Sequence, residues 1–286
     1  MNNMNRTLTI AIAGFASSLI GIGCAKSGAA NSTVTAALSM TGSSQPTAIA
    51  SYKKAHPLWQ LFSPVAVAFA PPAMVDGSSP ARNVMLTKAW IIVKEVEFKL
   101  AETAGAEEAA SSEIKFRGPF FVDLLSSIPV SFGAAEVPVG VYRRVKMKLE
   151  KDSALPAGAP TQLAGNSIYF EGTVSGSQFS YAAADGTEFK IAGAGGVNLN
   201  ETANLVLGVK VSDLFKLIKM DAVAAAVNKN ISDTNRITAT NACPAIDPSA
   251  NDIATCFRKG LEKAGKFGKD SDNNGEIEVG EDEVHD

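Results

Sequence analysis

Residues 141–151, VYRRVKMKLEK, carry the clearest pattern in this chain and decide its fold class. Apolar and charged side chains alternate along them, with Val145, Met147 and Leu149 on one side and Arg144, Lys146, Lys148 and Glu150 on the other. A two-residue period predicts a β-strand with one buried face. The basic side could be a nucleic-acid patch, but lysines also protect solvated strands from aggregation, and we favour that interpretation.

Further strands are predicted on both sides of this segment. Their apolar side chains alternate or run together between Gly- and Pro-rich turns, and no helical period separates them. The predicted strands are Val84–Leu100, Lys115–Leu125, Ser167–Val174, Phe179–Ala183, Glu188–Ile191 and Ala203–Val211. Such a series is typical of an all-β fold, and we expect an antiparallel β-sandwich over residues 81–218.

Two local features refine this expectation. In Val84–Leu100 one parity is apolar (Trp90, Ile92, Val96, Phe98 and Leu100), and Lys94 interrupts that face. A β-bulge or a rim position is therefore expected near Lys94. The dipeptide Asp185-Gly186 lies between two predicted strands and predicts a hairpin turn that pairs them.

Composition limits the functional classes. The chain has 286 residues, 46% hydrophobic and 19% charged, which excludes general disorder and a coiled coil. Its net charge of −3 argues against a nucleic-acid partner. The histidines, His56 and His285, both lie outside the predicted sandwich, so neither a Ser-His-Asp triad nor His-bound zinc is expected there. We therefore expect a protein that is not an enzyme.

The N-terminus predicts an export signal over residues 1–23. Arg6 precedes an uncharged, mostly apolar run, Thr7–Gly23, that ends in small residues. The run is short and contains Ser and Gly, so it is a poor membrane span. Residues 24–80 follow as a predicted disordered tether, because they are rich in Ala, Ser, Thr and Gly. An apolar, Pro-containing patch at 57–74 is either an edge strand or more tether.

The segment Gly21-Ile22-Gly23-Cys24 resembles the lipobox of bacterial lipoproteins, although Gly21 stands where that motif prefers Leu. The resemblance implies cleavage before Cys24 and lipidation of its side chain. Simple secretion with another cleavage site is the alternative. Ala25 after the cysteine, rather than Asp, implies by the same resemblance an outer-membrane anchor in the bacterial cell envelope.

Two segments of the predicted sandwich also carry a resemblance. GPFFVDLL at 118–125 and VPVGVYRRVKMKLE at 137–150 resemble an uncharacterised β-sandwich domain of bacterial envelope lipoproteins. The motif Pro138-x-Gly140-x-Tyr142 also resembles one in transthyretin-like and carboxypeptidase-regulatory-like sandwiches, so the expected sandwich is immunoglobulin- or transthyretin-like. The resemblance implies a fold and a compartment but no reaction. Physically, the Tyr142 ring should point inward with its hydroxyl bound to a nearby backbone group.

The C-terminal segment predicts a calcium site. Residues 266–286 hold eight acidic and two basic side chains, so this tail carries −6 and the remaining chain +3. Residues 270–281, DSDNNGEIEVGE, match the calcium-loop pattern D-x-[DN]-x-[DN]-G-x5-E. The predicted Ca²⁺ ligands of this loop, which resembles that of EF-hands, are Asp270, Asp272, Asn274, Glu276, Glu278 and Glu281. A disordered acidic tail is the alternative.

A helix and a disulfide are expected just before this loop. Ile253, Phe257 and Leu261 recur every four residues and predict an entering helix near 250–264. With Cys24 lipidated, Cys243 and Cys256 remain as a pair, which an oxidising compartment would join. We therefore expect residues 243–286 to form an appendage, connected to the sandwich by residues 219–242.

Three functional hypotheses remain. The first is a non-enzymatic, lipid-anchored surface module, binding or structural, with a calcium loop and a possible envelope protein or glycan partner. The second is a carbohydrate- or adhesion-type module that uses Trp59 or Trp90 for stacking. The third, least favoured, is a hydrolase that pairs Asp123 with Glu136 or Glu150.

Overall fold

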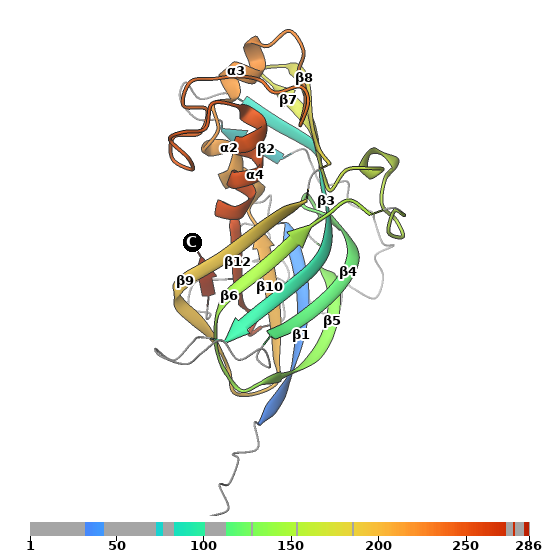
Figure 1. Ribbon diagram of the computed structural model, residues 1–286, viewed down its shortest axis with the longest axis vertical. Coiled ribbons are helices and arrows are strands. Elements are labelled where there is room, and N and C mark those ends of the chain that lie inside the picture. The colour runs from blue at the N-terminus through green and yellow to red at the C-terminus, as the bar shows by residue number, and fades with distance from the viewer. Residues whose placement is uncertain are drawn as a thin grey trace, which may run out of the picture. The chain divides into compact units, whose positions relative to one another are not determined.

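The computed structural model describes residues 32–42, 73–76, 83–100, 113–126, 128–152, 154–184, 186–272, 277 and 283–285 (Figure 1). The described strands form two sheets and are accompanied by few helices, which confirms the all-β class. Residues 32–286 belong to one unit. The predicted signal peptide and Cys24 lie outside the described residues.

The first sheet has the strand order β13-β12-β10-β1-β5. Strand β1 is parallel to β10 and antiparallel to β5, and β12 is antiparallel to both β10 and β13. The bounds are β1 Thr33–Gly42, β5 Val130–Pro138, β10 Ala203–Val209, β12 Gly265–Lys269 and β13 Glu283–His285.

The prediction of a tether over residues 24–80 is wrong for β1. This strand is hydrogen-bonded on both sides, and Ala36, Leu38 and Met40 are at most 1% exposed. Its apolar residues do alternate, but Ala, Ser and Thr dilute them to a composition typical of disorder. The short strand β2 (Ala73–Asp76) corrects the same prediction, since it pairs with β3.

The second sheet is organised around β3 (Asn83–Leu100). One edge of β3 pairs first with β7 and then with β6, and the other edge pairs with β2 and β4. The other strands are β4 Glu113–Asp123, β6 Gly140–Leu149, β7 Ile168–Val174, β8 Ser177–Ala183, β9 Thr187–Leu199 and β11 Asn230–Ser232. A 3-10 turn, η3 (Thr161–Leu163), precedes β7.

The bulge expected in β3 is present, because the register shifts between Val93 and Glu95. A second shift, between Leu86 and Lys88, was not predicted. The bulge between Val93 and Glu95 lies between Trp90 and Phe98, and it changes which face of the sheet each parity of the strand occupies. The expectation that Trp90 shares a buried face with Phe98 is therefore wrong. Trp90 is only half-buried, whereas Phe98 belongs to the core.

The hairpin predicted at Asp185-Gly186 is also wrong. Strands β8 and β9 lie apart in the sheet order β11-β8-β7-β3-β6-β9 and do not pair. The observed hairpin joins β7 to β8 through Ser175 and Gly176, whose φ angles are 49° and 80°. Two positive φ angles are the geometry of a type I′ turn. A turn dipeptide predicts a change of direction but not which strands become neighbours.

One cluster of buried side chains contacts both sheets and the helices. Phe98 of β3 and Phe267 of β12 meet between the sheets with ring centroids 4.9 Å apart. The helices are α2 Val211–Lys216, α3 Met220–Ala225 and α4 Ile253–Lys263. Figure 1 shows them beside β7 and β8, beyond the end of the first sheet.

The helix predicted near 250–264 is confirmed as α4, which begins after Asp252, whose side chain accepts a hydrogen bond from Thr255 N. The prediction that residues 243–286 form an appendage is wrong. Phe257 of α4 and Phe267 of β12 are fully buried in the shared core, and α3 lies within the predicted connecting segment. The C-terminal elements complete the fold because their apolar faces cover strands that would otherwise be exposed.

Tyr142 behaves as the sequence predicts. It is fully buried, and its hydroxyl donates a 2.8 Å hydrogen bond to the Pro138 carbonyl oxygen. Burial raises the pKa of Tyr142 to about 12. The bond fixes the turn between β5 and β6, so the motif Pro138-x-Gly140-x-Tyr142 has a structural role.

Candidate functional site

The predicted calcium loop, residues 270–281, lies between two paired strands. Strand β12 ends at Lys269, and β13 returns beside it from Glu283. The expected entry from a helix is wrong, because α4 ends at Lys263 and β12 follows at once. Residues Gly265–Lys269 pair with β10, and burial of Phe267 holds them extended. The loop therefore connects a hairpin and does not follow the helix–loop–helix plan of an EF-hand.

Two of the predicted ligands belong to the described residues. Asp270 is only 6% exposed, and its backbone N–H donates a 2.9 Å hydrogen bond to the Asn204 carbonyl. Asp272 is exposed. Asn274, Glu276, Glu278 and Glu281 lie outside the described residues. Within the described part of the chain, no three His, Cys, Asp or Glu side chains are grouped as a metal site.

Neighbouring contacts hold the start of the loop in place. Lys269 forms a 2.9 Å ion pair with Glu201, and this bond holds the pKa of Glu201 below its usual value. Ile277 is half-buried and lies over Gly208 of β10, where an added Cβ would be 3.8 Å from its Cδ1. The first position of the loop and one central position are thus both placed against β10.

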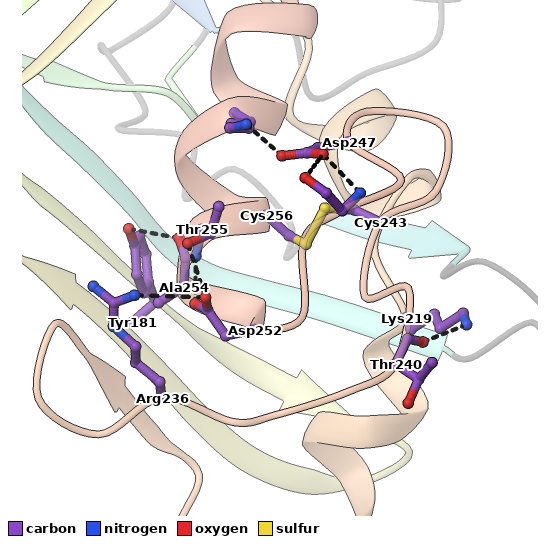
Figure 2. The surroundings of a disulfide bond; sticks show 12 residues. Tyr181, Lys219, Arg236, Thr240, Cys243, Asp247, Asp252, Ala254, Thr255 and Cys256 are labelled. Atoms are coloured by element: carbon purple, nitrogen blue, oxygen red, sulfur yellow. Dashed lines mark hydrogen bonds and ion pairs between the residues drawn. A yellow bond between two sulfur atoms is a disulfide. The ribbon is translucent and has the colours of Figure 1, made fainter.

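The predicted cysteine pair is at disulfide distance, with 2.04 Å between Cys243 Sγ and Cys256 Sγ and 5.7 Å between the Cα atoms (Figure 2). Both residues are fully buried. Beside them, Asp247 bonds to Lys259 of α4 and to Ser249. These bonds, Lys259 first, hold the pKa of Asp247 well below its usual value. The pair joins α4 to the turn that precedes it.

Further contacts tie this region to the rest of the core. Tyr181 of β8 donates a 3.3 Å hydrogen bond to the Ala254 carbonyl, and Lys219 Nζ donates a 2.9 Å bond to the Thr240 carbonyl (Figure 2). Arg236 forms a 3.5 Å ion pair with the capping residue Asp252. Because the disulfide lies within this network, the structure supports a stabilising role for it.

The outer side of the second sheet carries the remaining candidates. Trp90 stacks on Tyr169 of β7 with centroids 5.7 Å apart, and Phe121 of β4 meets Trp90 edge-on at 6.4 Å. Lys88 Nζ lies 5.4 Å from the Trp90 ring centroid, and it pairs with Glu171 at 3.0 Å. Neighbouring side chains therefore engage the Trp90 ring. Trp59, the other predicted stacking residue, lies outside the described residues.

The carboxylates of the hydrolase hypothesis have separate partners. Asp123 accepts a hydrogen bond from Leu125 N, and Glu136 accepts one from the Thr35 hydroxyl. Glu150 forms ion pairs with Lys94 at 2.8 Å and Lys148 at 3.4 Å. The hydrogen bond from Lys94 holds the pKa of Glu150 below its usual value. A general acid needs a raised pKa, so Glu150 is poorly suited to that role.

A shallow depression of about 450 Å³ adjoins Glu150 and is lined also by Lys148, Thr187 and Glu188. Glu188 pairs with Lys146 at 2.8 Å and with Lys190 at 3.5 Å. The acidic and basic groups at its rim thus largely neutralise one another. The charged groups around the depression are thus engaged with one another, and they do not converge on a common point where a substrate could bind.

No known protein family, curated protein or solved structure matches this chain. Among the described residues, no helix combines the length and the apolar character needed to cross a bilayer.

Proposed function

We propose that this chain is a non-enzymatic, lipid-anchored protein of the bacterial cell envelope that binds Ca²⁺ through residues 270–281. Cys24 carries the lipid, and the outer membrane is the proposed location. The two sheets form a β-sandwich of immunoglobulin or transthyretin type that serves as a surface binding or structural module. The contact of Phe98 with Phe267 across the sheets supports the packing of the two sheets on each other, and the sandwich type rests on the resemblance of Pro138-x-Gly140-x-Tyr142.

The observation that carries the calcium proposal is the position of Asp270. It is the first residue of a twelve-residue ligand pattern, and it stands where a buried strand ends. Its backbone N–H donates a hydrogen bond to the Asn204 carbonyl, so β10 holds the main chain at the first position of the pattern. A loop between paired strands is restrained at both ends, which lowers the entropy lost when it closes on an ion.

Affinity is expected to be modest. Extracellular calcium modules bind with dissociation constants of about 0.1–1 mM, and a single loop of mixed carboxylate and amide ligands belongs in that range. Binding to the folded state only would also raise the thermal midpoint as the calcium concentration increases.

The carbohydrate-binding alternative has weaker support. Trp90 is half-buried, and its ring contacts Tyr169, Phe121 and Lys88. A sugar platform needs a free aromatic face, so the geometry at Trp90 favours a cross-strand packing role.

Calorimetry of the full chain with Ca²⁺ tests the proposal. The parent should bind Ca²⁺ with a dissociation constant of about 1 mM or below. The variant Asp270→Asn with Asp272→Asn should show no saturable binding below about 10 mM calcium. The control Asp213→Asn, on helix α2, removes an exposed carboxylate from another region and should bind as the parent does. Equal titrations for parent and loop variant would refute the calcium site.

The lipid anchor has its own measurement. Intact mass of the exported chain should show acylation at Cys24 and the absence of residues 1–23, and Cys24→Ala should abolish the acyl mass. A mature protein without acyl chains would refute the anchor while leaving the calcium measurement unaffected.

A further inference from the structure

The start of β1 and the turn between β5 and β6 lie at the same end of the two sheets (Figure 1). Val139 N donates a 2.8 Å hydrogen bond to the Ser32 carbonyl, and Thr33 is paired with Pro138. Gly140 is paired with Leu199, so the end of β9 is also here. We call Val139, Val141, Arg143 and Arg144 the β5–β6 tip.

The tip combines exposed apolar and cationic side chains. Val139 is 41% exposed and Val141 is 37% exposed, and both are among the large hydrophobic residues that stand out as exposed in the described chain. The register shifts between Tyr142 and Arg144, and both Arg143 and Arg144 are exposed. Within the described residues, neither guanidinium is paired with a carboxylate.

The position of β1 sets a limit on the distance to the proposed anchor. Because β1 begins at Thr33, only seven residues, which is eight Cα–Cα steps, lie between Cys24 and Ser32. A chain of that length spans at most about 29 Å, whatever its conformation. An acyl group on Cys24 would therefore hold the tip end of the sheets near the bilayer.

We infer that the β5–β6 tip rests on the phospholipid surface into which Cys24 is anchored. This inference depends on the proposed lipid anchor. The two valines enter the interfacial layer, where exposed apolar groups are stabilised. The two arginines bind lipid phosphates, for which the guanidinium fork is well suited. The acyl group on Cys24 and the β5–β6 tip are then two separate attachments to the membrane. Together they determine the orientation of the protein relative to the bilayer.

Depth measurement on the lipidated full chain tests this orientation. The single variants Val139→Cys and Ile128→Cys are labelled with an environment-sensitive fluorophore and reconstituted into vesicles of phosphatidylethanolamine and phosphatidylglycerol. Ile128 is the matched control, since it is 74% exposed and lies before β5, at the other end of that strand from Val139. Nitroxide lipids should quench the label at position 139 about twofold or more and leave the label at position 128 unquenched.

One further variant and two outcomes separate the parts of the inference. Adding Arg143→Gln and Arg144→Gln to Val139→Cys should reduce the quenching on the vesicles that contain phosphatidylglycerol. The reduction should be smaller on vesicles of phosphatidylcholine alone, because these lack an anionic lipid for the arginines to bind. If both labels stay unquenched while the protein floats with the vesicles, the tip inference is overturned and the anchor stands. If mass analysis finds no acylation of Cys24, the anchor fails and the inference fails with it.

Discussion

The two halves of β3 lie in one strand yet belong to different surroundings. The bulge between Val93 and Glu95 divides them. On the N-terminal side the neighbours are β7 and β2, and on the C-terminal side the neighbour is β6, while β4 pairs with β3 on both sides of the bulge. Since a bulge changes both direction and parity, one long strand can contribute to two differently covered layers.

The inner faces of the two halves are covered by different elements. Beside β7 and β8, Phe257 of α4 stacks on Tyr181 at 4.6 Å and contacts Phe170 and Phe215. In the other half, the cover is the first sheet, with Phe267 of β12 over Phe98. Aromatic rings contribute to both interiors, together with aliphatic side chains such as Leu38 and Val145 in the sheet-covered half.

The outer faces differ as well. The N-terminal half carries Trp90, stacked with Tyr169. The C-terminal half carries alternating charges, in which Glu97 pairs with Lys115 at 3.4 Å and Lys146 pairs with Glu188 at 2.8 Å. In the basic stripe seen in the sequence, Lys146 is therefore paired across strands and Lys148 pairs with Glu150 just beyond its own strand, while Arg144 has no carboxylate partner among the described residues.

The largest effect is expected at the centre of the helix-covered half. Phe257→Ala should lower the free energy of unfolding by about 3–5 kcal/mol, because it removes a buried ring from an aromatic cluster. Leu38→Ala in β1 is the counterpart in the sheet-covered half and should lose about 2–5 kcal/mol. Urea denaturation should give one transition with an unchanged slope for both variants. A split transition for either variant would show that the two halves unfold separately.

Removal of the disulfide is expected to have the next largest effect, and only in the helix-covered half. Cys243→Ala with Cys256→Ala opens a loop with a sequence separation of 13 and should lower stability by about 3 kcal/mol. Thermal denaturation under oxidising conditions measures the loss. Reductant should destabilise the parent and leave the double variant unchanged, and equal sensitivity of both proteins would contradict this role for the pair.

A smaller effect is expected from Tyr142→Phe in the sheet-covered half. It removes the hydrogen bond to the Pro138 carbonyl and should lower stability by about 1 kcal/mol at neutral pH. The pKa of Tyr142 is about 12 in the folded protein against 10.0 ordinarily, so between these values the unfolded chain loses a proton that the folded chain retains.

Stability of the parent should therefore fall as pH rises from about 10 to about 12, and the Phe variant should show a shallower fall. The pKa of Tyr169 is also raised to about 12, by burial first and by its bond to Glu171. Tyr169→Phe is thus the matched control, and it leaves the Tyr142 contribution intact. Parallel pH profiles for the parent and Tyr142→Phe would contradict the assignment.

The smallest effect is expected on the charged outer face. Glu188→Gln breaks the ion pair with Lys146, but the carboxylate side chain is 37% exposed, so the loss should be about 0–1 kcal/mol. Added salt should reduce the difference further. Chemical denaturation at low and high salt measures it. A loss above about 2 kcal/mol would mean that this face stabilises the sheet far more than exposed pairs do.

Local sequence pattern predicted much of the structure correctly. Alternation located β6, a four-residue period located α4, and a charged residue in an apolar face indicated the bulge of β3. The spacing of Pro138 and Tyr142 predicted a hydroxyl bond between neighbouring elements. Each of these features is decided within one turn or a few residues, so the physical cause is present in the sequence itself.

Long-range pairing was predicted less well. The composition of β1 predicts a tether, because Ala, Ser and Thr form a strand here only through the hydrogen bonds to β5 and β10 on its two sides. The turn after Phe179–Ala183 predicts the wrong partner strand, because a turn dipeptide does not specify which strand edge is available for pairing. The candidate site shows the same limit. The ligand spacing of 270–281 is local, whereas its placement between β12 and β13 depends on β10.

The sequence by itself determined the all-β class and the position of the helix, because short-range periodicity is sufficient for them, and it predicted the pairing of Cys243 with Cys256 on the premise that Cys24 carries the lipid. Only the tertiary structure decided that β1, α4 and β12 share one core. Only the tertiary structure placed the start of β1 beside the β5–β6 tip. Burial is a property of facing surfaces, and which surfaces face each other is settled by contacts between residues far apart in the chain.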